Sequence, residues 1–159
     1  MEKNVQVQRI AAKAIIVNAV GEVLLLREAS TNPDGTNIGK YLLPGGRIEL
    51  GERVLAALER EVLEETGLKV VVGQPVFVSE WFPVIRGVST QIVGIFFACS
   101  SLTTEVTLSH EHDGFAWVSP SAVAGYAMTD NERQAIQQLG VAAQEAVHVQ
   151  AWRSGSVKL

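Results

Sequence analysis

Short apolar stretches separated by polar turns predict that the chain begins with β-strands. Residues 9–18 and 23–27 are rich in Ile, Val, Leu and Ala, and Gly21 between them favours a turn, so the two stretches predict a hairpin. Residues 29–40 are polar and rich in Asn, Thr and Gly, which predicts a loop. A short strand is predicted at 41–43. Because the loop precedes a glycine-rich segment, we expect it at the rim of a site.

The hydrophobic period then changes to that of a helix. From Arg53 to Thr66 there is no Gly or Pro, and Ala, Leu and Glu dominate, which predicts a helix. Gly67 is placed to cap its C-terminus. Leu55, Leu58 and Val62 fall on one narrow stripe at about 100° per residue, so we expect this stripe to pack on a sheet.

The rest of the chain predicts more strands and two further helices. The strands are expected at 68–72, 75–85, 90–100 and 114–118, with Gly73 and Pro75 as an interruption and a turn at residues 86–87. A short helix is expected at 120–126. Thr129 and Glu132 form a capping-box pattern that opens a helix reaching at least Val147. We therefore expect one domain over 1–159, with frayed ends at about 1–7 and 153–159 and a mixed sheet between helices, an α/β fold.

A cluster of glutamates on the predicted central helix needs a physical explanation. Glu61, Glu64 and Glu65 sit at i, i+3 and i+4, so they share one face, where like charges repel. A solvated acidic surface is the ordinary explanation of such a cluster. The alternative is a bound divalent cation, because Mg²⁺ prefers carboxylate, water and phosphate oxygens.

The segment from Gly46 to Leu68 favours the second explanation. It reads Gly, five residues, Glu, seven residues, Arg-Glu, an aliphatic residue, any residue, Glu-Glu, any residue, Gly and an aliphatic residue. This pattern resembles the Nudix box of the Nudix hydrolases. The resemblance implies an α/β/α sandwich with a mixed β-sheet. It also implies hydrolysis of a pyrophosphate bond in a nucleoside diphosphate derivative, with a divalent cation and a metal-activated water.

The resemblance assigns roles to residues of the box. Metal ligands are expected at Glu61, Glu64 and Glu65, with Glu52 as a further carboxylate of the metal site, and Arg60 is expected to orient a ligating glutamate. Next to the box, Gly45 and Gly46 allow the backbone to approach a ligand, and their N–H groups are expected to face the substrate phosphates. Arg47 is the arginine best placed to contact phosphate, while Glu49 is expected to hold the loop or to join the metal network.

Two groups outside the box are further candidates. The run from His110 to Asp113 is open to three interpretations: a solvated loop, a catalytic loop facing the metals, or an independent zinc site. For the second, the resemblance implies a residue of this loop that ligates metal or acts as general base. Glu111 is the first choice, followed by His112 and His110, because imidazole titrates near neutral pH. Trp81 belongs either to the core or to a platform on which a nucleobase stacks.

Composition limits the class of partner and the compartment. The net charge is −4 and there is no basic run, so nucleic acid is not an expected partner. Cys99 is the one cysteine of the chain, so no intrachain disulfide can form, and the polar N-terminus lacks the apolar core of a signal peptide. No stretch is long and apolar enough to span a membrane. These features predict a cytoplasmic protein.

The sequence thus predicts a Mg²⁺-dependent hydrolase, with Mn²⁺ as a substitute cation, acting on a small-molecule nucleoside diphosphate linked to X, of the nucleotide-sugar or ADP-ribose type. Alternatives are a (d)NTP pyrophosphatase of the nucleotide-sanitising type, a non-catalytic nucleotide-sensing Nudix module and an acidic interaction domain. The box does not specify the base or X. Homodimers are common in the family, and a homodimer is compatible with this sequence.

Overall fold

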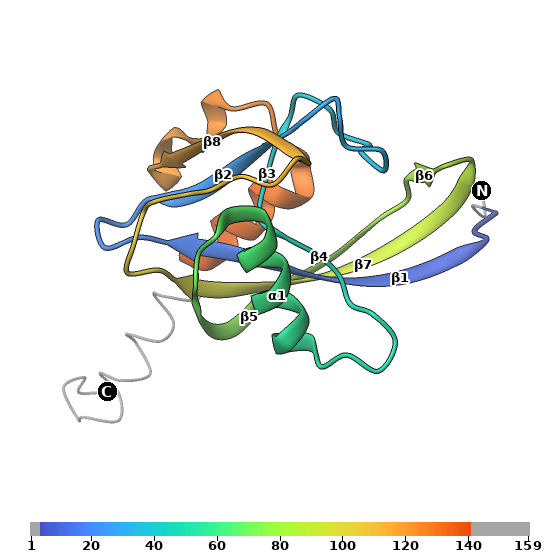
Figure 1. The fold of residues 1–159 in the computed structure, drawn as a ribbon, viewed down its shortest axis with the longest axis horizontal. Coiled ribbons are helices and arrows are strands. Elements are labelled where there is room, and N and C mark those ends of the chain that lie inside the picture. Colours follow the sequence, from blue (N-terminus) through green and yellow to red (C-terminus); the bar gives the residue numbers. More distant parts are fainter. Residues whose placement is uncertain (1–3, 141–159) are drawn as a thin grey trace, which may run out of the picture.

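The centre of the fold is a parallel pair of long strands. The computed structural model describes residues 4–140, and within them eight strands form one sheet (Figure 1). Strands β1 (Val7–Val17) and β7 (Val88–Ser100) run parallel along their whole length, and β5 (Val71–Trp81) is antiparallel to β7. The sheet is therefore mixed, as the sequence predicts.

The remaining strands pair with β1, β2 or β7. They are β2 (Val23–Glu28), β3 (Tyr41–Leu42), β4 (Gly45–Arg47), β6 (Val84–Ile85) and β8 (His112–Val118). β2 pairs with β1, β3 and β8, whereas β4 pairs with β1 and β6 with β7, and each of these pairs is antiparallel. β1 is thus flanked by β2 near its end and by β4 further back, and the candidate site lies along β4.

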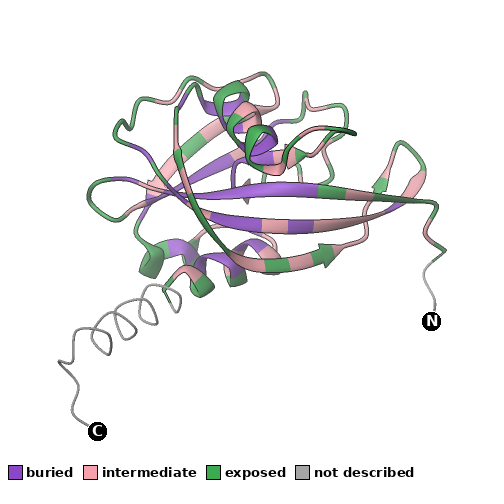
Figure 2. Cartoon of the chain, turned by 90° about the horizontal axis from the view of Figure 1, so that it is seen from below, coloured by how far each residue is buried: buried purple, intermediate pink, exposed green. Residues whose placement is uncertain are grey.

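Helices cover both faces of the sheet. Alternate residues of β1 point to opposite sides: Ala14 and Ile16 pack with Leu58 and Val62 of helix α1 (Val54–Thr66), while Ile15 packs in a second cluster with the C-terminal elements. That second cluster contains residues of the 3₁₀ helix η1 (Pro120–Gly125) and of the helical segment 130–140. Figure 2 shows the strands between α1 and that segment. The α/β/α architecture is confirmed.

Several details differ from the prediction. Leu55 is 48% exposed, because the buried face of α1 turns instead toward Ala57, Leu58 and Val62. The strands expected at 68–72 and 75–85 join in one strand, β5, since β-bulges near Pro75 absorb the interruption, but β5 ends at Trp81 and residues 84–85 form the separate strand β6. Gly67 caps α1 in the left-handed conformation, as predicted. The helix expected from Thr129 begins at residue 130, and its continuation to Val147 lies outside the described residues, as does 153–159.

Candidate functional site

The glycines before α1 form a strand, not the loop that the sequence predicts. Gly45 and Gly46 belong to β4 and pair with Lys13 and Ala12 of β1. A Cβ at Gly45 would lie 2.2 Å from the carbonyl oxygen of Ala12, and its φ is +125°, so the close approach requires glycine. The N–H of Gly45 donates to Oε2 of Glu65 at 2.8 Å. For Gly45, the expectation of an N–H that faces phosphate is therefore wrong in this structure.

The three clustered glutamates of α1, Glu61, Glu64 and Glu65, do not share one environment. Glu65 is buried, at 7% exposure, and the side chain of Glu61 is 18% exposed, whereas that of Glu64 is 59% exposed. Glu61 and Glu65 line a cleft along β4, and neither Glu64 nor Glu52 belongs to its lining. The structure thus brings two of the four predicted metal ligands directly to the cleft and leaves the other two beside it.

Arg60 binds three glutamates, Glu52, Glu61 and Glu64. Its Nε lies 2.8 Å from Oε1 of Glu52, and its Nη1 lies 2.8 Å from Oε1 of Glu61 and 3.3 Å from Oε2 of Glu64. Its hydrogen bonds lower the pKa of Glu52 to about 2. One guanidinium therefore offsets the repulsion among three carboxylates, and it matches the predicted role of orienting a glutamate.

Burial dominates the pKa values of Glu61 and Glu65, the two carboxylates that line the cleft. Burial raises the pKa of Glu65 to about 8, although the nearby Lys13 ammonium and the Gly45 N–H oppose the shift. Burial also raises the pKa of Glu61, against the opposing effect of Arg60, and the charges of Glu64 and Glu111 add to it. Burial disfavours the ionised form of both carboxylates, and a hard divalent cation bound to their oxygens would stabilise that form.

As the side chains stand in residues 4–140, no three metal-ligating groups converge closely enough to hold an ion. The geometry explains this, because Arg60 binds oxygens of Glu61 and Glu64 while Glu65 turns to the Gly45 N–H. The donor set fits a divalent cation in chemistry. Assembling it around an ion requires these carboxylates to leave their present partners.

The segment before β8 brings Glu111 to the same cleft. The N–H groups of Thr107 and Ser109 donate to the last carbonyls of α1, at Thr66 and Glu65, over 2.9 and 3.2 Å. These bonds fix the segment along the C-terminal end of α1. Glu111 follows two residues later, lines the cleft and raises the pKa values of Glu61 and Glu65 by its charge. Of the three interpretations of this run, the structure favours a loop that faces the glutamates.

His112 is not a solvated loop residue. It is the first residue of β8, its side chain is 7% exposed, and its Nε2 lies 4.0 Å from Oε1 of Glu65. Burial and the Lys13 charge lower its pKa to about 4, so the ring is neutral near pH 7. His110, in contrast, is exposed. The described residues hold no separate group that could bind zinc.

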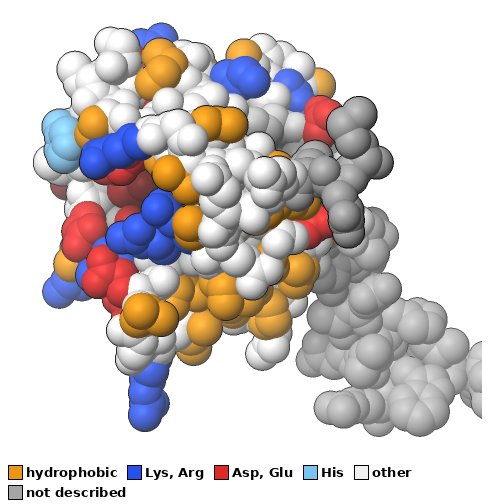
Figure 3. Space-filling view, turned by 90° about the vertical axis from the view of Figure 1, so that its right-hand side faces the viewer, with side chains coloured by type: hydrophobic (Ala, Val, Ile, Leu, Met, Phe, Trp, Pro, Cys, Tyr) orange, Lys and Arg blue, Asp and Glu red, His pale blue; other side chains and the backbone are white. Residues whose placement is uncertain are grey.

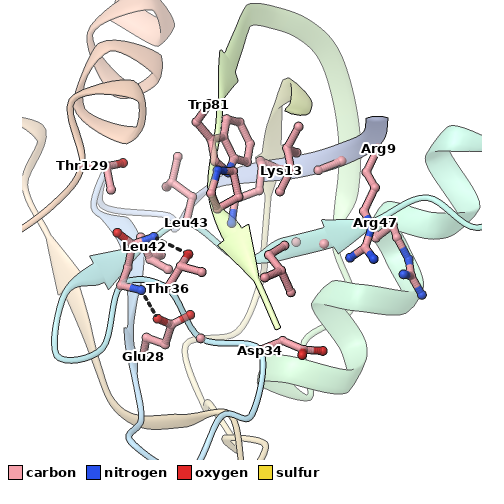
Figure 4. Close-up of a pocket in the computed structure, with 18 of the residues that line it drawn as sticks. Arg9, Lys13, Glu28, Asp34, Thr36, Leu42, Leu43, Arg47, Trp81 and Thr129 are labelled. Atoms are coloured by element: carbon pink, nitrogen blue, oxygen red, sulfur yellow. Dashed lines mark hydrogen bonds between the residues drawn. The ribbon is translucent and has the colours of Figure 1, made fainter. Parts of the chain in front are cut away.

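The cleft has a volume of about 850 Å³ and walls of different character. Figure 4 shows Trp81 above Lys13 and Leu43, with Leu42, Thr129 and Glu28 on one side and Arg9 and Arg47 on the other. Trp81 packs on Phe96, with centroids 6.5 Å apart, and also lines the cleft, so it belongs to the core while the nucleobase platform stays a prediction. In Figure 3, acidic and basic side chains gather around a recess on one face of the molecule.

Sequence analysis misses two charged residues at the inner wall. Lys13 and Glu132 are both buried, and Nζ of Lys13 lies 3.6 Å from Oε1 of Glu132. Glu132 also accepts the Leu43 N–H at 2.9 Å, so it does not complete the capping box with Thr129. A lysine inside the apolar run 10–17 was the available signal, since a charge among core residues needs a buried partner.

The comparison with known proteins decides the family. The sequence profile of the NUDIX domain matches residues 7–139. The chain belongs to the NUDIX family. No helix among the described residues of this NUDIX protein is long and apolar enough to cross a membrane.

Similar proteins include nucleoside triphosphatases. Nucleoside triphosphatase NudI of Escherichia fergusonii is 32% identical over 131 residues, which cover 76% of this chain and 89% of that protein. NudI of Klebsiella pneumoniae is 28% identical and covers 79% and 93%. The crystal structure of a MutT protein from Methanosarcina mazei Go1 has a TM-score of 0.76 at 29% identity and covers 87% of this NUDIX chain and 96% of that one. A UDP-X diphosphatase shares the fold, with a TM-score of 0.67 at 18% identity and coverage of 91% and 66%.

Proposed function

We propose that this NUDIX hydrolase cleaves a phosphoric anhydride bond of a nucleoside triphosphate and depends on Mg²⁺, with Mn²⁺ as a substitute. The observation that carries the proposal is the meeting of two charge types in one cleft: the carboxylates Glu61 and Glu65, and the cations Arg9, Lys13 and Arg47. Carboxylates suit a divalent cation and the cations suit phosphate. The NudI relatives, named as nucleoside triphosphatases, favour a triphosphate over the diphosphate derivative that the sequence predicts.

The cation would be held by Glu61, Glu64 and Glu65, with Glu52 and Arg60 beside them. When bound, a divalent cation neutralises phosphate charge and lowers the pKa of a bound water. Glu61 and Glu65 line the cleft where such an ion would meet the substrate, and Glu64 completes the set from the adjacent turn of α1. Glu52 reaches them through Arg60, which bonds to both its oxygens.

Glu111 is the general base that accepts the proton of the attacking water. This carboxylate lines the cleft and lies near enough to Glu61 and Glu65 to affect both pKa values. His112 is neutral near pH 7 and buried behind Glu65, which suits a hydrogen-bonding role better than that of a base. Water oxygen forms the new bond to phosphorus, its proton passes to Glu111, and the anhydride bond breaks. The products are a nucleoside monophosphate and pyrophosphate.

The remaining lining residues would bind the substrate. Gly46 and Arg47 lie on β4 beside Glu61, where phosphates would approach, and Gly45 allows this strand to lie close to β1. Trp81 offers an aromatic face for the nucleobase, since it borders the cleft above Leu43 (Figure 4). Of the substrate-binding residues that the sequence predicts, these assignments keep Gly46, Arg47 and Trp81, give Gly45 a structural role, and add Arg9 and Lys13.

A nucleoside diphosphate linked to X is the second candidate. The observation that favours it is the cleft volume of about 850 Å³, at the large end for small-molecule sites. Such a cleft has room for a second sugar. In a non-catalytic nucleotide-sensing module or an acidic interaction domain, the glutamates would bind a ligand or partner without hydrolysing it. The homodimer and the cytoplasmic location stay predictions.

Product analysis on a nucleotide panel tests the proposal. The panel contains (d)NTPs, nucleotide sugars, ADP-ribose and dinucleoside polyphosphates, each incubated with Mg²⁺, with Mn²⁺ or with EDTA and separated by chromatography. We expect metal-dependent release of a monophosphate and pyrophosphate from a triphosphate. Turnover of nucleotide sugars alone would favour the second candidate. Binding without turnover under every condition would overturn the hydrolase proposal in favour of a sensing module.

A further inference from the structure

Two arginines at one end of the cleft have no partner of their own. Arg9 lies on β1 and Arg47 on β4, and both line the cleft. Within residues 4–140, no hydrogen bond or ion pair engages either guanidinium. Arg27 and Arg60 differ, because Arg27 pairs with a carboxylate at 2.6 Å and Arg60 with three. Two unpaired guanidiniums that border a cleft indicate a site for an anion.

Strand pairing brings the two arginines together. Arg47 stands opposite Ala11 in the antiparallel pair of β4 and β1, and Arg9 is two residues from Ala11. Residues two apart on a strand share a face, and so do directly opposed residues, so Arg47 and Arg9 are diagonal neighbours. The separation of such a pair, about 7–8 Å, allows two long side chains to bind one group between them. Figure 4 shows both side chains at the same end of the cleft.

The order of residues along β4 gives the cleft a direction. Gly45 contacts Glu65, a Cβ at Gly46 would touch Glu61 at 2.6 Å, and Arg47 follows. In the other direction lies Leu43, near Leu42 and Thr129. A substrate whose scissile phosphate lies at the two glutamates therefore has the arginines on one side and an apolar region on the other.

We propose that Arg9 and Arg47 together bind the terminal phosphate of a nucleoside triphosphate and so select triphosphates over nucleoside diphosphates linked to an uncharged group. The inference rests on the proposed function, and it names the feature of the substrate that the cleft distinguishes. A terminal phosphate carries more charge than any other part of the substrate, and a guanidinium can bind it through two parallel hydrogen bonds. An uncharged sugar at that position leaves both guanidiniums unpaired.

The test compares Arg9→Gln, Arg47→Gln and the double variant on two substrates, a nucleoside triphosphate and the hexose derivative of the same nucleoside diphosphate. Each single variant should lower kcat/KM for the triphosphate about 10- to 100-fold, the loss expected for one charge-assisted hydrogen-bonding group. The value for the hexose derivative should change less than about 3-fold. Arg9→Lys should recover part of the loss, because it restores charge without the two-pronged geometry.

Arg53→Gln is the matched control. Arg53 is exposed, its guanidinium has no hydrogen bond or ion pair within residues 4–140, and it lies outside the cleft lining, so this variant removes the same charge elsewhere. It should leave both substrates unaffected. Equal losses on the two substrates, or none on the triphosphate, would overturn the inference while leaving the hydrolase proposal intact. A wild type that cleaves the hexose derivative and not the triphosphate would also overturn the inference, and it would favour the second candidate substrate.

Calorimetric titration with inorganic pyrophosphate in Mg²⁺ buffer keeps the inference separate from turnover. The wild type and Arg53→Gln should bind pyrophosphate alike, and the Arg9 and Arg47 variants should bind it about 10-fold more weakly or worse. This result would support the anion site even if no nucleotide were hydrolysed. Undiminished binding in the double variant, or no binding by the wild type, would rule it out.

Discussion

The backbone N–H of Gly45 donates to Oε2 of Glu65 at 2.8 Å, and this bond joins the edge of the sheet to α1. Because Glu65 is buried, the bond supplies one of its few partners. It requires β4 to lie against β1 so closely that the carbonyl oxygen of Ala12 would be 2.2 Å from a Cβ at position 45. The position of the innermost glutamate therefore depends on a glycine outside the helix.

Gly45→Ala should destabilise the protein by about 3 kcal/mol or more, since the new methyl group meets backbone and φ is +125°. The free energy of unfolding, measured by urea titration, checks this. Gly125→Ala is the control, because a Cβ there meets nothing within 4 Å and its φ is not in the positive range. That variant should remain within about 1 kcal/mol of the wild type. Similar values for both variants would show that β4 can move away from β1 at little cost.

Pattern and spacing were enough to predict the layers, the central helix, its glycine cap and the carboxylates near the site. They could not show that Leu55 is exposed, because two stripes of a helix can carry apolar residues and tertiary packing selects one. Nor could they show that Glu61 and Glu65 face the cleft while Glu64 faces solvent. That difference arises because Glu61 and Glu65 face Gly46 and Gly45 of β4, a tertiary contact that periodicity does not encode.

Long-range pairing accounts for the rest. Lys13 and Glu132 are 119 positions apart and meet only because β1 and the segment 130–140 pack on one face of the sheet. A local pattern, the capping box, assigned Glu132 to Thr129, but its carboxylate binds Lys13 and the Leu43 N–H instead. Burial of a charge outweighs a local cap, since an unpaired buried charge costs far more.

Glu64→Gln should lower kcat at least about 100-fold with little change in fold, if Glu64 supplies a carboxylate to the cation. The side chain is 59% exposed, so the substitution creates no cavity and breaks only the 3.3 Å contact with Arg60. Steady-state kinetics in Mg²⁺ gives kcat, and circular dichroism reports the fold. Glu59→Gln, an exposed position on the same helix, should retain wild-type activity. Full activity of Glu64→Gln would exclude Glu64 as a ligand.

Arg60→Gln should make stability depend more strongly on the cation. Without the guanidinium, Glu52, Glu61 and Glu64 repel one another, and we expect a loss of about 1 kcal/mol in EDTA. Mg²⁺ should recover more stability in this variant than in the wild type, because a ligand that binds only the folded state stabilises it. Thermal unfolding with and without Mg²⁺ measures both effects. An equal Mg²⁺ shift in the two proteins would mean that Arg60 and the cation do not act on the same carboxylates.

Glu65 should make the metal-free protein less stable as pH rises. Its folded pKa is about 8 against an ordinary 4.5, so between these values the folded state holds a proton that the unfolded state has lost. The contribution of Glu65 is full below pH 4.5 and is lost as pH rises through about 8, at no more than about 1.4 kcal/mol per pH unit. His112, with a folded pKa of about 4, acts in the opposite direction and only below about pH 6.5. The window from pH 6.5 to 8 therefore excludes the effect of His112. Burial also raises the pKa values of Glu61 and Glu132, which act in the same direction as Glu65, so a Glu65 variant is needed to separate its share.

Urea unfolding across that window in EDTA compares the wild type with Glu65→Gln and Glu59→Gln. The wild type and Glu59→Gln should lose stability as pH rises, whereas Glu65→Gln, which cannot ionise, should show a flatter profile. Parallel profiles for all three proteins would contradict a raised pKa at Glu65. Mg²⁺ should flatten the wild-type profile as well, because a cation beside Glu65 favours its ionised form in the folded state and brings its pKa closer to that of the unfolded chain. A wild-type slope that Mg²⁺ leaves unchanged would place the cation away from Glu65.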